Sequence, residues 1–202
     1  MRLPNHIGII PDGNRRFATS LGLTKDAGYS HGILPGVALF KQCEKLGVKE
    51  LTFYGFTLDN TKRPTSQKTA FIRACIRSVK LISKENAEIL VVGNTESKNF
   101  PKELIPYTTR KICNNGGLKV NFLINYGWEW DLKNTADLRS KDISRMDLII
   151  RWGGRRRLSG FLPVQSVYSD FYIIDDYWPK FKENHLIQAL NWYDSQDVTL
   201  GG

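Results

Sequence analysis

Apolar residues in this chain form short continuous runs, which alternate with longer stretches where apolar residues recur every three or four positions. Several of the short runs are apolar on both faces, as is typical of strands in a parallel sheet covered by helices. We therefore expect an α/β fold with an open, mostly parallel, six-stranded sheet flanked by helices. The predicted strands are His6–Ile10, Glu50–Phe56, Glu88–Val92, Leu118–Tyr126, Asp147–Arg151 and Phe171–Ile174.

The longer stretches predict the helices. Leu39, Cys43 and Leu46 have helical spacing before Gly47, and a longer helix follows Pro64. Shorter helices are expected at Pro101–Cys113, Trp130–Arg139 and Asn184–Ser195.

Length and charge limit the class of protein. The chain has 202 residues, of which 41% are hydrophobic, enough for one sizeable core, so we expect residues 1–202 to form a single domain. With 29 basic and 20 acidic residues the formal net charge is +9, which indicates an anionic partner. Nucleic acid, a membrane surface and a phosphorylated small molecule all satisfy that condition.

Cysteine usage predicts a cytoplasmic location. Cys43, Cys75 and Cys113 are odd in number, far apart and set in segments with helical apolar spacing. This pattern is typical of reduced core thiols rather than of disulfides or a metal site. The N-terminus lacks the pattern of a signal peptide, and no apolar run approaches the ~18 residues of a membrane span, so we expect a soluble protein.

The first strand ends in a candidate phosphate site. Ligands of open α/β sheets bind beyond the carboxyl ends of the strands, and Pro11 to Arg16 follows the first strand directly. Gly13 allows close approach of a ligand, unpaired N–H groups are expected at the helix start, and Arg15 and Arg16 add positive charge. Asp12 would repel a phosphate unless Mg²⁺ lay between them. Taken alone, the segment is better explained as a strong turn signal, so the other segments have to decide.

Three further strand ends carry polar residues. Thr57–Pro64 ends in two basic residues, Asn125–Trp128 follows the fourth strand, and Arg151–Gly160 holds four arginines and Ser159 among glycines. Each of these has a simpler explanation as a solvated loop, and for an Arg-rich loop taken alone that explanation is favoured. Two basic strand ends and one acidic strand end on the same sheet edge instead favour two phosphorylated groups near a metal ion.

The order and spacing of these motifs identify a family resemblance over nearly the whole chain. The sequence resembles the cis-prenyltransferases, the group that includes undecaprenyl diphosphate synthase. The matching segments are His6–Ala18, Leu51–Thr57, Asn60 with Arg63-Pro64, Asn125–Gly127, Asp147–Arg151, Gly153-Gly154, Arg157–Ser159 with Phe161-Leu162 and Gln165, and Trp178-Pro179.

The resemblance implies a role for each matching position. Asp12 and Asn60 match catalytic positions, Asp12 also as the Mg²⁺ ligand, with Asp170 in the place of a second metal-binding acid. Thr57 and Asn60 match residues implicated in placing the acceptor and removing its proton. The remaining positions imply two diphosphate sites: the allylic diphosphate at Gly13, Asn14, Arg15, Arg16, Phe17, Lys25, Tyr29 and Arg63, and the acceptor, isopentenyl diphosphate, at Thr57, Arg151, Arg157 and Ser159.

The chain also departs from the family pattern. Tyr29 replaces a histidine and Lys25 an arginine, while Arg155 and Arg156 replace a glutamate and a histidine and so add positive charge near the acceptor. The segment between Trp128 and Met146 is shorter than in typical members. The chain ends in Thr199-Leu200-Gly201-Gly202, without the arginine of the family's Arg-x-Gly tail.

The expected function is Mg²⁺-dependent condensation of an allylic diphosphate with isopentenyl diphosphate or a related five-carbon diphosphate, by a homodimer. Leu123 and Ile124 are expected to line the product channel and close it early, which predicts a product of about ten to twenty carbons. A long product would imply transient contact with a membrane surface. The alternatives are a non-catalytic partner subunit of a heteromeric enzyme and a basic nucleic-acid-binding protein. Asp12 and Asp170 argue against nucleic acid, because they would repel phosphates without a metal.

Overall fold

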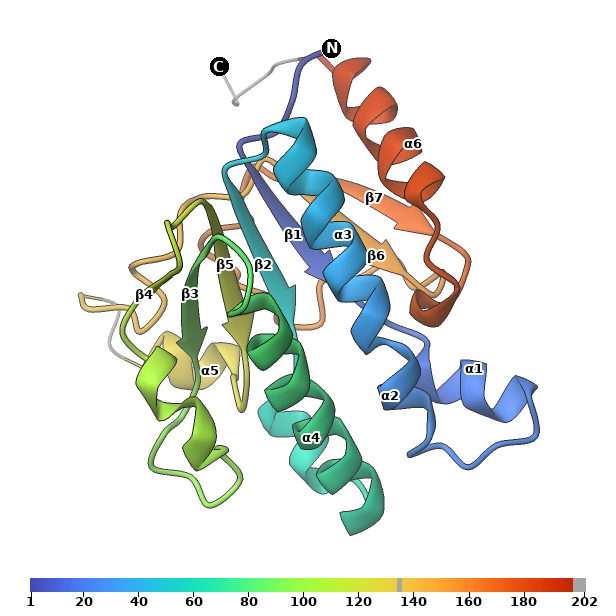
Figure 1. Cartoon of the computed structure of the whole chain (residues 1–202), viewed down its shortest axis with the longest axis vertical. Helices are drawn as coiled ribbons and strands as arrows, with labels where there is room; N and C mark the ends of the chain where they lie inside the picture. Colours follow the sequence, from blue (N-terminus) through green and yellow to red (C-terminus); the bar gives the residue numbers. More distant parts are fainter. Residues whose placement is uncertain (134–135, 198–202) are drawn as a thin grey trace.

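The computed structural model describes residues 1–133 and 136–197, and its centre is one seven-stranded sheet (Figure 1). The strand order is β4-β3-β5-β2-β1-β6-β7, and every neighbouring pair is parallel except β3 and β4. The strands are β1 (His6–Ile10), β2 (Glu50–Tyr54), β3 (Ala87–Val92), β4 (Lys111–Cys113), β5 (Leu118–Leu123), β6 (Leu148–Trp152) and β7 (Asp170–Ile174).

The long helices lie together on one face of this sheet (Figure 1). The α-helices are α1 (Asn14–Ser20), α2 (Gly28–His31), α3 (Ile33–Leu46), α4 (Thr65–Ile82), α5 (Trp128–Asp131) and α6 (Glu183–Asp194), and the 3₁₀ helices are η1 (Leu58–Lys62), η2 (Lys102–Tyr107) and η3 (Trp178–Lys180). Helices α3, α4 and α6 contribute buried side chains to one hydrophobic cluster with the sheet. The opposite face is covered by the segments around Ile143, Met146 and Phe161.

Alternation along the strands assigns each side chain to one of these faces. Phe53 on β2 and Phe122 on β5 belong to the cluster under the helices, whereas their neighbours Tyr54 and Leu123 belong to the cluster on the other face. This assignment decides which residues can line a channel between sheet and helices.

The structure corrects two predicted helices. The segment Pro101–Cys113 forms the 3₁₀ helix η2, which contains Pro106, and then the seventh strand β4, where Cys113 pairs with Ala87. A proline inside a helix removes a backbone donor, which limits a longer α-helix here. The predicted helix Trp130–Arg139 is also wrong: only the four residues of α5 are helical, and residues 134–135 lie outside the described part.

The three cysteines are free and buried, as expected for reduced core thiols. Burial raises the pKa of Cys75 to about 12, so the thiol stays protonated and unreactive at neutral pH. Across the described residues, none of the helices has both the length and the apolar character needed to span a membrane.

Candidate active site

A cavity of about 510 Å³ opens at the carboxyl ends of β1, β2 and β6. Seven cationic side chains line it, together with two carboxylates, Asp12 and Asp59. The cations come from three segments that are distant in sequence: Arg15, Arg16 and Lys25, then Arg63, and then Arg151, Arg155 and Arg157. Such an excess of guanidinium groups around one cavity suits an anion with several charged oxygens, such as a diphosphate.

The turn after β1 needs glycine at position 13. Gly13 has a φ of 104°, and a Cβ atom there would lie 2.8 Å from the ring of Tyr177. A second contact also fixes the turn, because the backbone N–H of Trp178 donates to the Asp12 carbonyl at 2.9 Å. Backbone contacts therefore hold the Asp12 side chain at the cavity wall.

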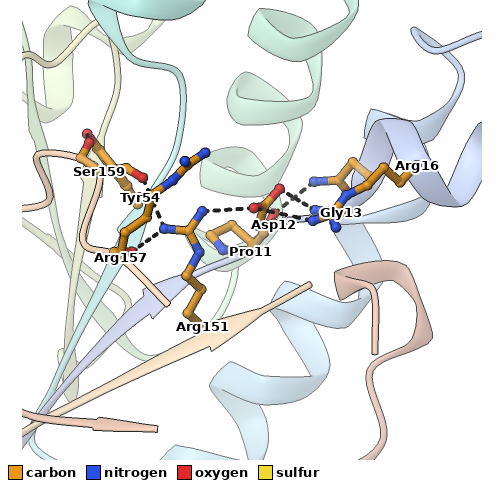
Figure 2. Close-up of polar contacts among 9 residues, drawn as sticks. Pro11, Asp12, Gly13, Arg16, Tyr54, Arg151, Arg157 and Ser159 are labelled. Carbon is orange, nitrogen blue, oxygen red and sulfur yellow. Dashed lines mark hydrogen bonds and ion pairs between the residues drawn. The ribbon is translucent and has the colours of Figure 1, made fainter. Parts of the chain in front are cut away.

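Asp12 is bound to arginine in this structure (Figure 2). Its Oδ2 accepts from Arg151 Nη2 at 2.9 Å and lies 3.4 Å from Arg16 Nη2, and its Oδ1 accepts from the Gly13 N–H at 2.6 Å. Burial alone would raise the pKa of Asp12, but the hydrogen bond and charge of Arg151, then Arg16 and the Gly13 N–H, lower it below its ordinary value. Asp12 is therefore ionised at neutral pH.

Arg151 extends from β6 into the wall of the cavity and is 4% exposed. Its Nη1 donates to the Arg157 carbonyl and, at 3.0 Å, to Ser159 Oγ (Figure 2). Its buried Nε has no hydrogen-bond partner among residues 1–133 and 136–197. Tyr54 fixes the same loop, because its hydroxyl donates to the Ser159 carbonyl at 2.7 Å. Arg151 thus joins the β1 turn to the 157–159 loop.

Two aromatic rings and a capping motif shape the exit of β2. Asn60 Oδ1 accepts from the Thr57 N–H at 3.1 Å and caps η1. Arg63 Nη1 donates to the Tyr29 hydroxyl at 2.7 Å, and the Tyr29 ring stacks on Phe71 with 4.5 Å between centroids. Burial raises the pKa of Tyr29 against the opposing charges of Arg63 and Arg15, so the phenol is neutral and accepts from Arg63.

Most of the predicted site residues meet at this cavity. Those that line it are Asp12, Gly13, Asn14, Arg15, Arg16, Lys25, Tyr29, Thr57, Asn60, Arg63, Arg151, Arg157 and Ser159. Phe17 does not line it and packs edge-on against His31, with 5.3 Å between ring centroids. Their roles toward a ligand remain predictions.

Asp170, the predicted second metal-binding acid, does not line the cavity and lies far from Asp12 within the chain. Asp170 begins β7 and is paired with Leu148, which is in turn paired with Ile7 near the start of β1. Asp12 follows the other end of β1, about 15 Å away along the strand direction. Strand register could not be read from the sequence, and it places the two carboxylates at opposite ends of the sheet.

The predicted exit Asn125–Trp128 supports the cavity from outside. The Leu58 N–H donates to the Tyr126 carbonyl at 2.8 Å, which fixes the start of η1 and thereby Asn60. The Tyr126 hydroxyl in turn donates to the buried carboxylate of Asp131 at 2.7 Å. The polar groups of this segment therefore stabilise the structure around the cavity and do not line it.

Several lining residues were not among the predicted site residues, and two of them, Tyr54 and Phe71, shape the cavity. The predicted strand Glu50–Phe56 includes Tyr54, which precedes Gly55 at the strand exit and whose hydroxyl needs a buried partner. Phe71 lies on α4, and its place opposite Tyr29 follows only from the packing of α2 on α4. A polar-tipped aromatic at a strand exit was the available signal for Tyr54; we find none for Phe71.

The residues that line the cavity suit a metal ion that arrives bound to a substrate better than a metal site built wholly from protein side chains. Among the described residues no group of three or more His, Cys, Asp or Glu side chains could hold a metal. Asp59, the other carboxylate at the cavity, is exposed and bound to Lys62 at 2.8 Å. Mg²⁺ commonly binds through one carboxylate together with substrate phosphates, and Asp12 satisfies that minimum.

Fold and cavity together define an α/β protein with a strongly cationic cavity at the carboxyl edge of its sheet, where ligands of such folds bind. Comparison with known families is more specific. The family described as "Putative undecaprenyl diphosphate synthase" matches residues 10–141 and 133–201. The chain therefore belongs to the cis-prenyltransferase family, and it is an enzyme of prenyl transfer.

Individual relatives agree with this assignment. The chain is 31% identical, over its whole length and 91% of the relative, to a ditrans,polycis-undecaprenyl-diphosphate synthase of Yersinia pseudotuberculosis. It is 30% identical to an isoprenyl transferase of Leptospira interrogans, covering 99% of this chain and 95% of that one.

Solved structures support the fold. The structure matches lavandulyl diphosphate synthase from Lavandula x intermedia, solved in complex with dimethylallyl diphosphate, with a TM-score of 0.83, 24% identity and 98% coverage of both chains. It matches a probable undecaprenyl diphosphate synthase from Campylobacter jejuni with a TM-score of 0.78 and 19% identity, over the whole of both chains.

Proposed function

We propose that the protein transfers an allylic prenyl group to isopentenyl diphosphate, or a related five-carbon diphosphate, with Mg²⁺ and with release of diphosphate. The observation that carries this proposal is that seven cationic side chains line the same cavity as Asp12. Two diphosphate groups carry more negative charge than a small basic loop on a protein surface would balance. Family membership supplies the reaction class.

The cationic side chains fall into two groups that suit two diphosphates. Arg15, Arg16, Lys25 and Arg63 lie on the side of α1, α2 and η1, and we assign the allylic diphosphate to them. Arg157 and Ser159 lie on the loop after β6, and we assign the acceptor diphosphate to that loop. Arg151 contacts both the loop and Asp12, so it lies between the groups.

The chain's own residues then act on the charges that develop. When the allylic C–O bond breaks, its electron pair leaves with the diphosphate, and fixed arginines stabilise the growing negative charge. The acceptor double bond forms the new C–C bond, and the acceptor then loses a proton to a diphosphate oxygen, which acts as the base. Thr57 and Asn60, held in the η1 cap, orient the acceptor for these steps.

Asp12 would hold the metal ion together with diphosphate oxygens. When bound, Mg²⁺ supplies Lewis-acid stabilisation of the leaving group. For that role Asp12 has to exchange its contact with Arg151, and an incoming diphosphate offers Arg151 a replacement anion.

The proposal includes a short product and a homodimer. The expected channel residues require correction: Leu123 lies on the sheet face away from the helices, and Ile124 does not line the cavities described here. A short product is instead supported by the stacked rings of Phe53 and Phe122 on the helix side.

The predicted dimer is tested by light scattering, where a fully active monomer would contradict it. The chain end at Thr199–Gly202 lies outside the described residues.

The test is a transfer assay with purified protein, labelled isopentenyl diphosphate and a series of allylic primers, with Mg²⁺ or with EDTA. We expect diphosphate release and mass-resolved prenyl products only with Mg²⁺. Asp12→Asn should abolish turnover, whereas the matched variant Asp59→Asn should not, because Asp59 is exposed and paired with Lys62. Absence of turnover with every primer, in the protein alone, would favour a non-catalytic partner subunit.

A further inference from the structure

A second, smaller cavity lies beneath the cationic one, between the sheet and helices α2, α3 and α4. The two cavities share a mouth, since Pro11, Asn14, Tyr29, Tyr54, Gly55 and Phe71 line both. The deeper cavity has almost wholly apolar walls and a volume of about 70 Å³. A ligand with its charged end among the arginines can therefore extend an apolar group into it.

Bulky rings limit the depth of this cavity. The Phe53 and Phe122 rings stack with 5.4 Å between centroids and 14° between planes, and both residues are buried. Trp178 is fixed beside them, because its indole N–H donates to the Gly32 carbonyl at 2.8 Å. Ile82, fully buried, also lines the cavity. None of these side chains can move aside without disturbing the main core cluster.

The volume corresponds to one isoprenoid unit. A water molecule needs roughly 10–15 Å³ of such space, so about 70 Å³ admits roughly five to seven water-sized groups. A methyl or methylene group is about the size of a water molecule. A dimethylallyl group has five carbons and fits, whereas geranyl and farnesyl groups, with ten and fifteen carbons, exceed the space.

We propose that the allylic substrate is a five-carbon diphosphate, dimethylallyl diphosphate, and that the stacked rings of Phe53 and Phe122 set this limit. The inference rests on the proposed function and narrows its substrate. With a five-carbon acceptor, the first condensation then gives a ten-carbon product, and the same stacked rings oppose re-entry of that product as a primer.

Phe122 has a matched control beside it on the same strand. Phe122 and Leu123 are both buried in β5, yet Phe122 lines the apolar cavity and Leu123 packs on the opposite face of the sheet. Replacing either by alanine removes a buried apolar side chain. Only Phe122→Ala enlarges the cavity.

Gly36 allows the opposite change. A Cβ atom at Gly36 would lie 3.9 Å from Trp178 Cζ2 and 4.0 Å from Phe53 Cε1, which are ordinary contacts. Gly36→Ala therefore places a methyl group in the cavity without a clash. Alanine is also the better helix former in α3, so this variant should fold at least as well as the wild type.

The experiment measures kcat/KM for dimethylallyl, geranyl and farnesyl diphosphate in the wild type and the three variants, with thermal unfolding as a folding check. We expect the wild type to prefer the dimethylallyl substrate by at least roughly tenfold over each longer primer, since one surplus methylene in an apolar pocket costs about that factor. Phe122→Ala should shift preference toward geranyl diphosphate, and Leu123→Ala should not. Gly36→Ala should lower kcat/KM for dimethylallyl diphosphate by roughly tenfold.

Three results would overturn the inference. The wild type could use farnesyl diphosphate as efficiently as the dimethylallyl substrate, Phe122→Ala and Leu123→Ala could shift the primer preference equally, or Gly36→Ala could leave kcat/KM unchanged. Calorimetric binding of the unreactive thiolodiphosphate analogues of the three primers separates this inference from the proposed reaction. Preferential binding of the dimethylallyl analogue without turnover would support the pocket and reject the reaction. Turnover without that binding preference would support the reaction and reject the pocket.

Discussion

Two polar clusters on the same sheet differ in how their hydrogen bonds are completed. The first lies in the amino half of the sheet, where Asn121 donates to Glu50 Oε1 at 2.6 Å and to Thr52 Oγ1 at 2.9 Å. His6 Nε2 lies 2.8 Å from the same Thr52 oxygen, and Arg110 donates to Asn121 Oδ1 at 2.9 Å. The second is the cationic cavity, where the buried Arg151 Nε and Asn14 Oδ1 have no partner among the described residues.

The difference separates polar groups that maintain the fold from those available to a ligand. A buried polar group costs free energy unless it is hydrogen-bonded, and the network at Asn121 meets that condition within the protein. The cavity instead combines surplus positive charge with incomplete hydrogen bonding. We therefore expect substitutions in the first cluster to lower stability, and substitutions in the second to lower activity.

The largest effect should come from Asp12→Asn. The variant keeps an oxygen that can accept from Arg151 but loses the negative charge, so kcat should fall by roughly 10²–10³-fold or more. The free energy of unfolding should change by only about 1 kcal/mol. Steady-state kinetics and urea unfolding measure the two quantities. A stability loss large enough to explain the lost activity would remove the distinction between the clusters.

Asn121→Ala should show the reverse pattern. It leaves Glu50, Thr52 and Arg110 without their shared partner, which should cost about 2–3 kcal/mol of unfolding free energy. The exposed Asn115→Ala serves as control and should change stability by less than about 0.5 kcal/mol. If the folded Asn121→Ala protein had altered KM values, the network would not be purely structural.

Arg157→Ala should weaken acceptor binding. Arg157 lines the cavity, whereas its neighbour Arg156 does not. Loss of a charge-assisted hydrogen bond costs about 1.5–3 kcal/mol, so KM for the acceptor should rise by roughly 10- to 100-fold, and by less for the allylic primer. Arg156→Ala should leave both values nearly unchanged. Equal effects on both substrates would contradict the two assigned diphosphate positions.

The smallest effect should be a dependence of stability on pH through His6. Burial lowers the pKa of His6 below 6.5 against the opposing charge of Glu50, so the folded protein binds this proton less readily than the unfolded chain. Stability from His6 is complete above pH 6.5 and is lost as the pH falls from there through the lowered pKa, by at most about 1.4 kcal/mol per unit.

Urea unfolding between pH 7.5 and 5.5 checks this prediction. The slope should decrease in His6→Gln and persist in His31→Gln, because His31 lies exposed on α2. A slope that is unchanged in His6→Gln would assign the pH dependence to other groups.

The six predicted strands and most of the site could be predicted because both depend on local pattern. Buried strands are apolar runs, and site residues follow the runs directly. Strand register and facing are not local: they determine that Asp170 lies far from Asp12, and that Phe122 rather than Leu123 faces the helices. Where strands are apolar on both faces, alternation gives no sign of which residues point to which side. Likewise, the Asp12–Arg151 ion pair joins residues 139 positions apart.

That ion pair also affects how tightly an anion can bind. A free arginine loses rotamer freedom when it closes on a ligand, at a cost of up to about 1.5–2 kcal/mol. Arg151 is already held in place by the protein itself, because Asp12, Ser159 and the Arg157 carbonyl bind its guanidinium. Its conformational entropy was therefore lost during folding, and an arriving diphosphate meets a guanidinium already fixed in the cavity wall.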